Sequence, residues 1–177
     1  MDKVEIPLSK TKMLLVIMGS LLFVVFGVFC VTTLADNQTR YLPAYVKAVG
    51  ILSATFFSLT GTYGIWKLFD NKAGLTIDKN GILDNSSGGA IGLIRWADVT
   101  RIETIQISST KLLLIHVSNP EFYLDKVKGI KRRALKANHK MYGTPLCIAS
   151  VALKYDFSAL ERLMYDRFRD VQRAADV

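Results

Sequence analysis

The sequence predicts a membrane-anchored α+β protein, in which a two-helix hairpin precedes an antiparallel sheet and a C-terminal helix. Three observations support this class. Half of the 177 residues are apolar and the mean hydropathy is +0.26, which is high for a soluble domain of this length. Two long uncharged runs lie near the N-terminus. The rest of the chain shows short alternating runs typical of strands and ends in one helical periodicity.

The uncharged runs predict two membrane-spanning helices. Residues 13–35 and residues 48–66 contain no charged side chain. Since about 20 apolar residues cross the hydrocarbon core as a helix, we expect spans over about 13–35 and 46–68. A cleaved signal peptide is the alternative for the first run, but its apolar region would be shorter. A buried core hairpin is the alternative for the pair.

The residues around the runs predict the orientation of the hairpin. The connection, residues 36–44, is short and polar, and Arg40 is its one basic residue, with Lys47 at the edge of the second span. More basic residues flank the outer ends: Lys3, Lys10, Lys12, Lys67, Lys72 and Lys79. Because positive charge favours the cytoplasmic side, we expect both termini in the cytoplasm. The predicted division is therefore a tail and membrane hairpin, 1–70, and a cytoplasmic domain, 71–177.

Small residues recur within the spans and predict close helix packing. Their line in the second span is Gly50, Ala54, Ser58 and Thr62, and the first span offers Gly19 and Gly27. Such residues let two helices approach closely. The partner is either the first span of the same chain or a second protomer. No charge lies within either run, which argues against an ion pathway or a transporter.

The residues after position 70 predict one small antiparallel domain. Asn80-Gly81 is a hairpin turn signal between the first two runs. The predicted strands are 75–79, 82–86, 90–96, 98–108, 111–117 and 144–153. Asn119-Pro120 ends the fifth strand and starts a helix, because proline suits the first helical position.

A C-terminal amphipathic helix completes the domain. It is expected to begin near Ser158, where Ser158 and Glu161 have capping-box spacing. Its apolar stripe is expected to pack on the sheet and comprises Leu160, Leu163, Met164, Phe168 and Val171. Several strands followed by one such helix is the order of a pleckstrin-homology-like domain, a small antiparallel barrel closed by a helix.

Residues 126–140 form the strongest charge cluster of the chain. They carry seven positive charges, whereas residues 71–177 as a whole carry a net +6. The seven are Lys126, Lys128, Lys131, Arg132, Arg133, Lys136 and Lys140. In a helix, Lys128, Arg132, Lys136 and Lys140 form one stripe. An apolar stripe lies on another side and comprises Ile130, Ala134, Ala137 and Met141.

Three interpretations of this cluster stay open: an anionic lipid surface, an anionic ligand or protein partner, and an inert solvated face. Lipid is favoured because a bilayer-tethered domain lies beside an anionic leaflet. Nucleic acid is disfavoured since the cluster lacks interleaved aromatic residues. The chain has no phosphate-binding loop, nucleophile elbow or metal-ligand motif. We therefore expect a non-enzymatic protein without a cofactor or metal.

The chain as a whole resembles a family of small bacterial membrane proteins. The segments that carry the resemblance are "GLTIDKNGILDNSS", "TKLLLIHVSNPEFYL" and "KANHKMYGTPLCIASVALKYDFSAL". The resemblance implies a membrane hairpin, a cytoplasmic pleckstrin-homology-like domain and a place in the bacterial inner membrane, but it implies no activity or site residue. We expect a binding or scaffolding module that docks on anionic lipid. The alternative is a signal-gated membrane effector or toxin-immunity protein, whose barrel binds a ligand or toxin and whose spans oligomerise.

Overall fold

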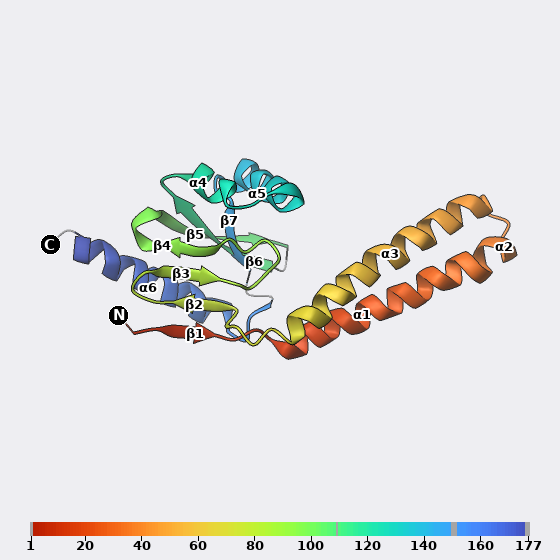
Figure 1. Ribbon diagram of the computed structural model, residues 1–177, viewed down its shortest axis with the longest axis horizontal. Helices are drawn as coiled ribbons and strands as arrows, with labels where there is room; N and C mark the ends of the chain where they lie inside the picture. Colours follow the sequence, from red (N-terminus) through yellow and green to blue (C-terminus); the bar gives the residue numbers. More distant parts are fainter. Residues whose placement is uncertain (1, 109, 150–151, 176–177) are drawn as a thin grey trace. The chain divides into compact units, whose positions relative to one another are not determined.

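The computed structural model describes residues 2–108, 110–149 and 152–175, and the chain forms two compact units (Figure 1). The helical unit comprises residues Lys10–Asn71. The sheet unit combines the residues up to Ser9 with those from Lys72 onward. The chain therefore leaves the sheet unit once, forms the helical unit and returns.

The helical unit is an antiparallel pair of long apolar helices. It contains α1 (Lys10–Phe29), the π-helical turn η1 (Cys30–Leu34), α2 (Ala35–Asn37) and α3 (Pro43–Leu68). The continuous helical stretches are 28 and 26 residues long, and both are long and apolar enough to cross a membrane. In the most apolar part of the first helix 17% of residues are buried, and in that of the second helix 11% are buried. A buried core hairpin does not fit this exposure.

The first sheet takes its edge strand from the N-terminal tail. Its order is β1 (Val4–Ile6), β2 (Leu75–Ile77), β3 (Gly81–Asp84) and β4 (Gly92–Arg95), all antiparallel. The helical unit is thus inserted between two hydrogen-bonded strands. This differs from the predicted division, which grouped the tail with the hairpin. Three residues of strand are too few for periodicity to reveal, and the pairing with β2 decides their place.

The β2–β3 hairpin forms where Asn80-Gly81 predicts it, with a different turn. The Asp78 carboxylate accepts hydrogen bonds from the Asn80 and Gly81 amides at 2.8 and 3.2 Å. Of the two predicted turn residues, only Gly81 has a positive φ. A Cβ at Gly81 would clash with the Ile94 carbonyl oxygen on β4. Glycine is therefore required here for a close backbone approach.

The second sheet follows a short connection from the first. The 3₁₀ turn η2 (Trp96–Asp98) leads into β5 (Val99–Ile107), which pairs antiparallel with β6 (Thr110–Val117). The third strand, β7 (Leu146–Ala149), pairs with β6 and is shorter than the predicted 144–153, of which residues 150–151 lie outside the described residues. The predicted α+β class with antiparallel pairing is confirmed, and its strands divide between two sheets.

Three helices complete the sheet unit. Between β6 and β7 lie α4 (Pro120–Asp125) and α5 (Gly129–Tyr142). Asn119 caps α4 by accepting a hydrogen bond from the Phe122 amide at 3.1 Å, as proline at the next position predicts. Figure 1 shows α4 and α5 together at the top of the sheet unit, whereas α6 lies at its lower left.

Helix α6 (Phe157–Ala175) closes the core as predicted. Leu160 and Met164 are fully buried, and the other residues of its predicted stripe are half-buried. The predicted cap is wrong by two positions. The Asp156 carboxylate accepts from the Ala159 amide at 3.0 Å, so Asp156 caps the helix and Ser158 lies in its first turn.

Candidate functional site

The basic cluster of residues 126–140 centres on helix α5. The helix begins at Gly129, whose φ is +61°, after Lys128 in an extended conformation. It ends at Gly143, whose φ is +74° and whose amide donates to the His139 carbonyl oxygen at 2.9 Å. A left-handed glycine after the last turn is a common helix terminator. The two glycines thus limit the helix to the basic segment.

The inner face of α5 packs on the sheet unit through few apolar atoms. Leu135 is 3% exposed and is the one fully buried residue of the helix. Lys131, Arg132, Asn138, His139 and Tyr142 beside it are half-buried. The helix therefore packs through Leu135 and the stems of polar side chains.

The opposite side of the helix combines apolar and basic side chains. We call it the α5 outer face, and it comprises Ile130, Arg133, Ala134, Lys136, Ala137, Lys140 and Met141, all exposed. Ile130 is 85% exposed and Met141 is 63% exposed. Because successive residues are about 100° apart around the axis, the basic and apolar strips lie side by side.

The seven predicted basic residues separate into different environments. Arg133, Lys136 and Lys140 lie on the α5 outer face, and Lys128 is exposed just before the helix. The Lys131 ammonium donates to the Ala90 carbonyl oxygen at 2.6 Å. Arg132 forms an ion pair with Asp125 at 2.7 Å. Lys126 lies over the rings of Phe122 and Tyr123, at 4.2 and 4.5 Å from their centroids.

The predicted stripe Lys128, Arg132, Lys136 and Lys140 is therefore not one surface. Each step of four residues advances about 40° around a helix, so a line of four positions turns by roughly a third of the circumference. Arg132 falls beside the inner face, whereas Lys136 and Lys140 fall on the outer face. Arg133, which the stripe left out, joins them there.

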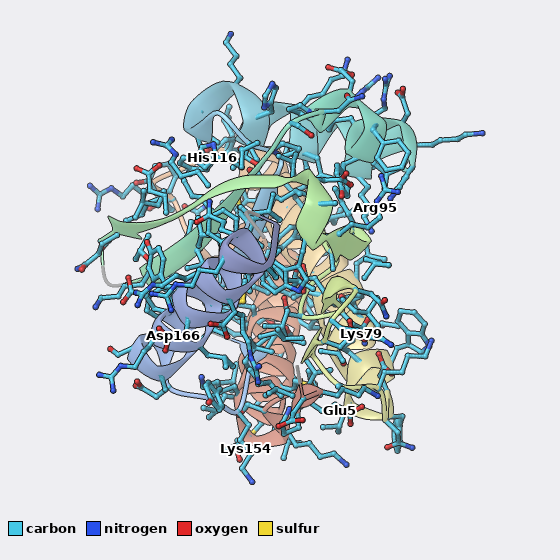
Figure 2. The ribbon with its side chains drawn as sticks, turned by 90° about the vertical axis from the view of Figure 1, so that its left-hand side faces the viewer. Glu5, Lys79, Arg95, His116, Lys154 and Asp166 are labelled. Atoms are coloured by element: carbon cyan, nitrogen blue, oxygen red, sulfur yellow. The ribbon has the colours of Figure 1, made fainter. Side chains whose placement is uncertain are left out.

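Tyr123 fixes the neighbouring helix α4 to the rest of the sheet unit. Its hydroxyl donates to Asp98 Oδ2 at 2.6 Å and accepts from the Arg95 amide at 3.3 Å. The Arg95 guanidinium also donates to both oxygens of Asp98, at 3.0 and 3.2 Å. Figure 2 shows Arg95 on the side of the unit that carries α4, away from Asp166 of α6. Sequence reasoning missed this buried tyrosine, whose signal is an aromatic residue next to Leu124 in a short helix.

Burial and hydrogen bonding shift the ionisation of this cluster. Burial, together with the hydrogen bond to Asp98, raises the pKa of Tyr123 to about 12. Burial alone would raise the pKa of Asp98, but the hydrogen bonds from Tyr123 and Arg95 outweigh it and lower that pKa. The tyrosine is therefore a proton donor and the carboxylate is charged at neutral pH.

Helix α5 is tied to one particular end of the first sheet. Its anchor Ala90 belongs to the β3–β4 loop, which follows Asp84 and precedes Gly92. Asp84 pairs with Leu75 at the start of β2, and Leu75 pairs with Ile6 at the end of β1. The chain leaves for the helical unit after β1 and returns before β2. The first turn of α5 is therefore anchored at the end of the sheet where both chain connections lie.

The small residues of the helical unit meet within one chain. A Cβ at Gly27 would lie 2.7 Å from the Gly50 carbonyl oxygen and 3.0 Å from the Ala54 amide nitrogen. A Cβ at Gly50 would lie 2.7 Å from the Gly27 carbonyl oxygen. The contact continues at Gly61, which lies beside Ser20. Of the two partners considered for the second span, the structure thus shows the first span of the same chain.

The predicted small-residue line departs from this contact at three positions. Ser58 and Thr62 are exposed, and a Cβ at Gly19 would have no atom within 4 Å. The packed residues Gly50, Ala54, Gly61 and Gly64 follow steps of three, four and seven, as in a coiled-coil seam, so a line of constant step four drifts off it. Sequence reasoning missed Gly61 and Gly64 because it followed one spacing.

Other reactive side chains are dispersed over the described part of the chain. Among those residues no group of three or more His, Cys, Asp and Glu is close enough to hold a metal ion. On the β5–β6 pair Glu103 forms an ion pair with Arg101 at 2.9 Å, and His116 Nε2 lies 3.3 Å from the Glu103 carboxylate. Burial raises the pKa of the Cys147 thiol to about 11, which keeps it protonated at neutral pH.

Comparison of the chain with protein-family models, with curated proteins and with solved structures finds no match.

Proposed function

We propose that the protein is a two-span inner-membrane protein whose cytoplasmic sheet unit is a non-enzymatic binding module that docks on anionic lipid. The apolar helices α1 and α3 support the anchor, since both exceed the length of the hydrocarbon core. Four and then three antiparallel strands followed by a long helix support the proposed pleckstrin-homology-like domain. The helices α4 and α5 lie between its last two strands, β6 and β7.

The pairing of β1 with β2 supports the hairpin topology. β1 precedes α1 and β2 follows α3, and the two strands form a hydrogen-bonded pair. Paired strands share one compartment, so the chain crosses a bilayer twice if α1 crosses it at all. Arg40 and Lys47 are the basic residues near the α2–α3 connection, whereas six lysines flank the opposite ends of the two helices: Lys3, Lys10, Lys12, Lys67, Lys72 and Lys79. This excess of basic residues at the opposite ends favours cytoplasmic termini.

The α5 outer face is the observation that carries the docking proposal. Arg133, Lys136 and Lys140 are exposed beside one another on a helix anchored near both chain connections. An anionic leaflet attracts each nearby Lys or Arg by about 1 kcal/mol. This attraction decays over about 8–10 Å at physiological salt, so a short tether matters. The charge of this face and the short connections to the apolar helices favour the anionic leaflet as the partner.

The alternative of a signal-gated effector or toxin-immunity protein draws less support from the described residues. It needs spans that associate between protomers through the small-residue line. Gly50 and Ala54 instead pack against Gly27 of the same chain.

A reconstitution experiment tests the proposed docking. The full chain is placed in lipid nanodiscs, with an environment-sensitive dye on Ala137→Cys in a background where Cys30 and Cys147 are alanine. We expect a blue shift with phosphatidylglycerol that is absent with phosphatidylcholine and is reduced, though not abolished, by high salt. The same dye at Arg173, an exposed residue of α6, serves as the control. An equal signal at position 137 in both lipids would overturn the proposal.

A further inference from the structure

The most exposed apolar side chains of the sheet unit lie beside its basic strip. Ile130 is 85% exposed and Met141 is 63% exposed, whereas the next values among the described residues of this unit are 45% for Leu83 and 44% for Ile107. Single exposed apolar residues are ordinary on a protein surface. Two such residues on one helix face, joined by Ala134 and Ala137, form a continuous strip that an aqueous surface does not favour.

The strip has a defined position around α5. At about 100° per residue, Ala137, Ile130, Met141 and Ala134 fall within an arc of roughly 60°. Lys136, Lys140 and Arg133 fall within an adjoining arc of about the same width. Buried Leu135 lies on the far side of the helix. An apolar strip flanked by cations is the pattern of helices that lie in the plane of a membrane interface.

We infer that α5 is an interfacial helix, whose apolar strip enters the boundary between head groups and acyl chains while Arg133, Lys136 and Lys140 hold anionic head groups. The inference rests on the proposed function and adds the mode of contact. Charge complementarity selects lipid as the occupant, because three cations border the strip and both chain connections lead to apolar helices. The alanines in the middle of the strip allow the helix axis to approach the surface closely.

The helix is ordered before it docks. Lys131 holds the Ala90 carbonyl oxygen, Arg132 pairs with Asp125, and Leu135 is buried. A free amphipathic peptide loses conformational entropy when it folds on a membrane, and a preformed helix avoids that loss. Shallow insertion of the short apolar strip is therefore enough to hold the preformed helix at the membrane. The docked helix also orients the whole sheet unit, with α6 on a different side of it (Figure 1).

Apolar insertion and surface attraction respond differently to salt. Pure electrostatic attraction weakens as the Debye length shortens. Burial of Ile130 and Met141 in the acyl region is insensitive to that screening. The inference therefore expects a docked fraction that survives high salt in anionic bilayers, in addition to the salt-sensitive fraction.

Acyl-chain quenching in the full chain tests the inference. The Ala137→Cys dye is placed in nanodiscs of phosphatidylglycerol and phosphatidylcholine, in which some lipids carry a nitroxide near the top of the acyl chain. We expect quenching that persists at high salt. The double variant Ile130→Ser with Met141→Ser should lower the salt-resistant docking by at least about tenfold, from the loss of two buried side chains. Ile130→Leu with Met141→Leu is the matched control and should retain it.

The outcomes separate the inference from the proposed function. If the serine variant is quenched like the natural chain, α5 does not insert, and the inference falls while electrostatic docking stands. If the natural chain shows no preference for phosphatidylglycerol in any salt, docking and insertion both fall. Equal thermal unfolding of the serine and leucine variants excludes a folding defect as the cause of a loss.

Discussion

Replacing Arg133, Lys136 and Lys140 with glutamine removes three positive charges from the α5 outer face. These side chains make none of the hydrogen bonds or ion pairs found among the described residues, and all three are exposed. The contacts that hold α5 are made by Lys131, Arg132 and Leu135. The triple variant should therefore fold normally, and any loss of docking reports on charge.

The size of the loss follows from the number of charges. At about 1 kcal/mol for each cation at an anionic leaflet, three cations contribute about 3 kcal/mol. This is about a 150-fold change in the equilibrium between the docked and undocked sheet unit. At 1 M salt the Debye length falls to about 3 Å, so the variant and the natural chain should then differ little.

The assay follows the Ala137→Cys dye in nanodiscs as the fraction of phosphatidylglycerol is raised at low salt. The natural chain should dock at a low anionic fraction and the triple variant at a much higher one. The matched control replaces Arg162, Arg169 and Arg173, three exposed residues of α6, with glutamine. The reasoning is refuted if the α5 variant docks like the natural chain, or if the α6 control loses docking equally.

Two further predictions concern helix packing and pH. Gly27→Leu should lower the free energy of unfolding of the helical unit by about 1–3 kcal/mol, because a Cβ at position 27 would lie 2.7 Å from the Gly50 carbonyl oxygen. Gly19→Leu should be tolerated, and equal effects of the two would contradict the packing. Since the pKa of Tyr123 rises from 10.0 to about 12 on folding, its contribution to stability is complete below pH 10 and is lost as the pH rises through about 12. The Tyr123→Phe variant should lack this alkaline dependence, and its free energy of unfolding at neutral pH should be lower by about 1–3 kcal/mol. If the variant and the natural chain show the same dependence of stability on pH, the role of the phenol is refuted.

Several elements could be predicted because their signals are local. The uncharged runs predict α1 and α3, since the thickness of a bilayer sets a length that a sequence shows directly. The alternation of Ile102 and its neighbours predicts β5, and the stripe through Leu160 and Met164 predicts α6. The cap of α6 was misplaced because Ser158 and Asp156 offer competing cap signals two residues apart.

Other elements depend on distant parts of the chain. Strand β1 has three residues, and its pairing with Leu75 and Ile77 across the whole helical unit is a long-range contact without a local pattern. The same limit applies to Tyr123, whose partners Arg95 and Asp98 precede it by more than twenty residues. Neither the β1–β2 pairing nor the hydrogen bonds of Tyr123 can be predicted from the local periodicity of the sequence.

By itself the sequence determined that the chain contains two helices of membrane length, an antiparallel domain and a basic segment. Composition and spacing suffice for these features, because each is a property of consecutive residues. The tertiary structure alone decided which side of α5 meets the sheet unit. Helical spacing shows two stripes with equal clarity, and the burial of Leu135 leaves Ile130, Met141 and three of the seven cations together on the outer face.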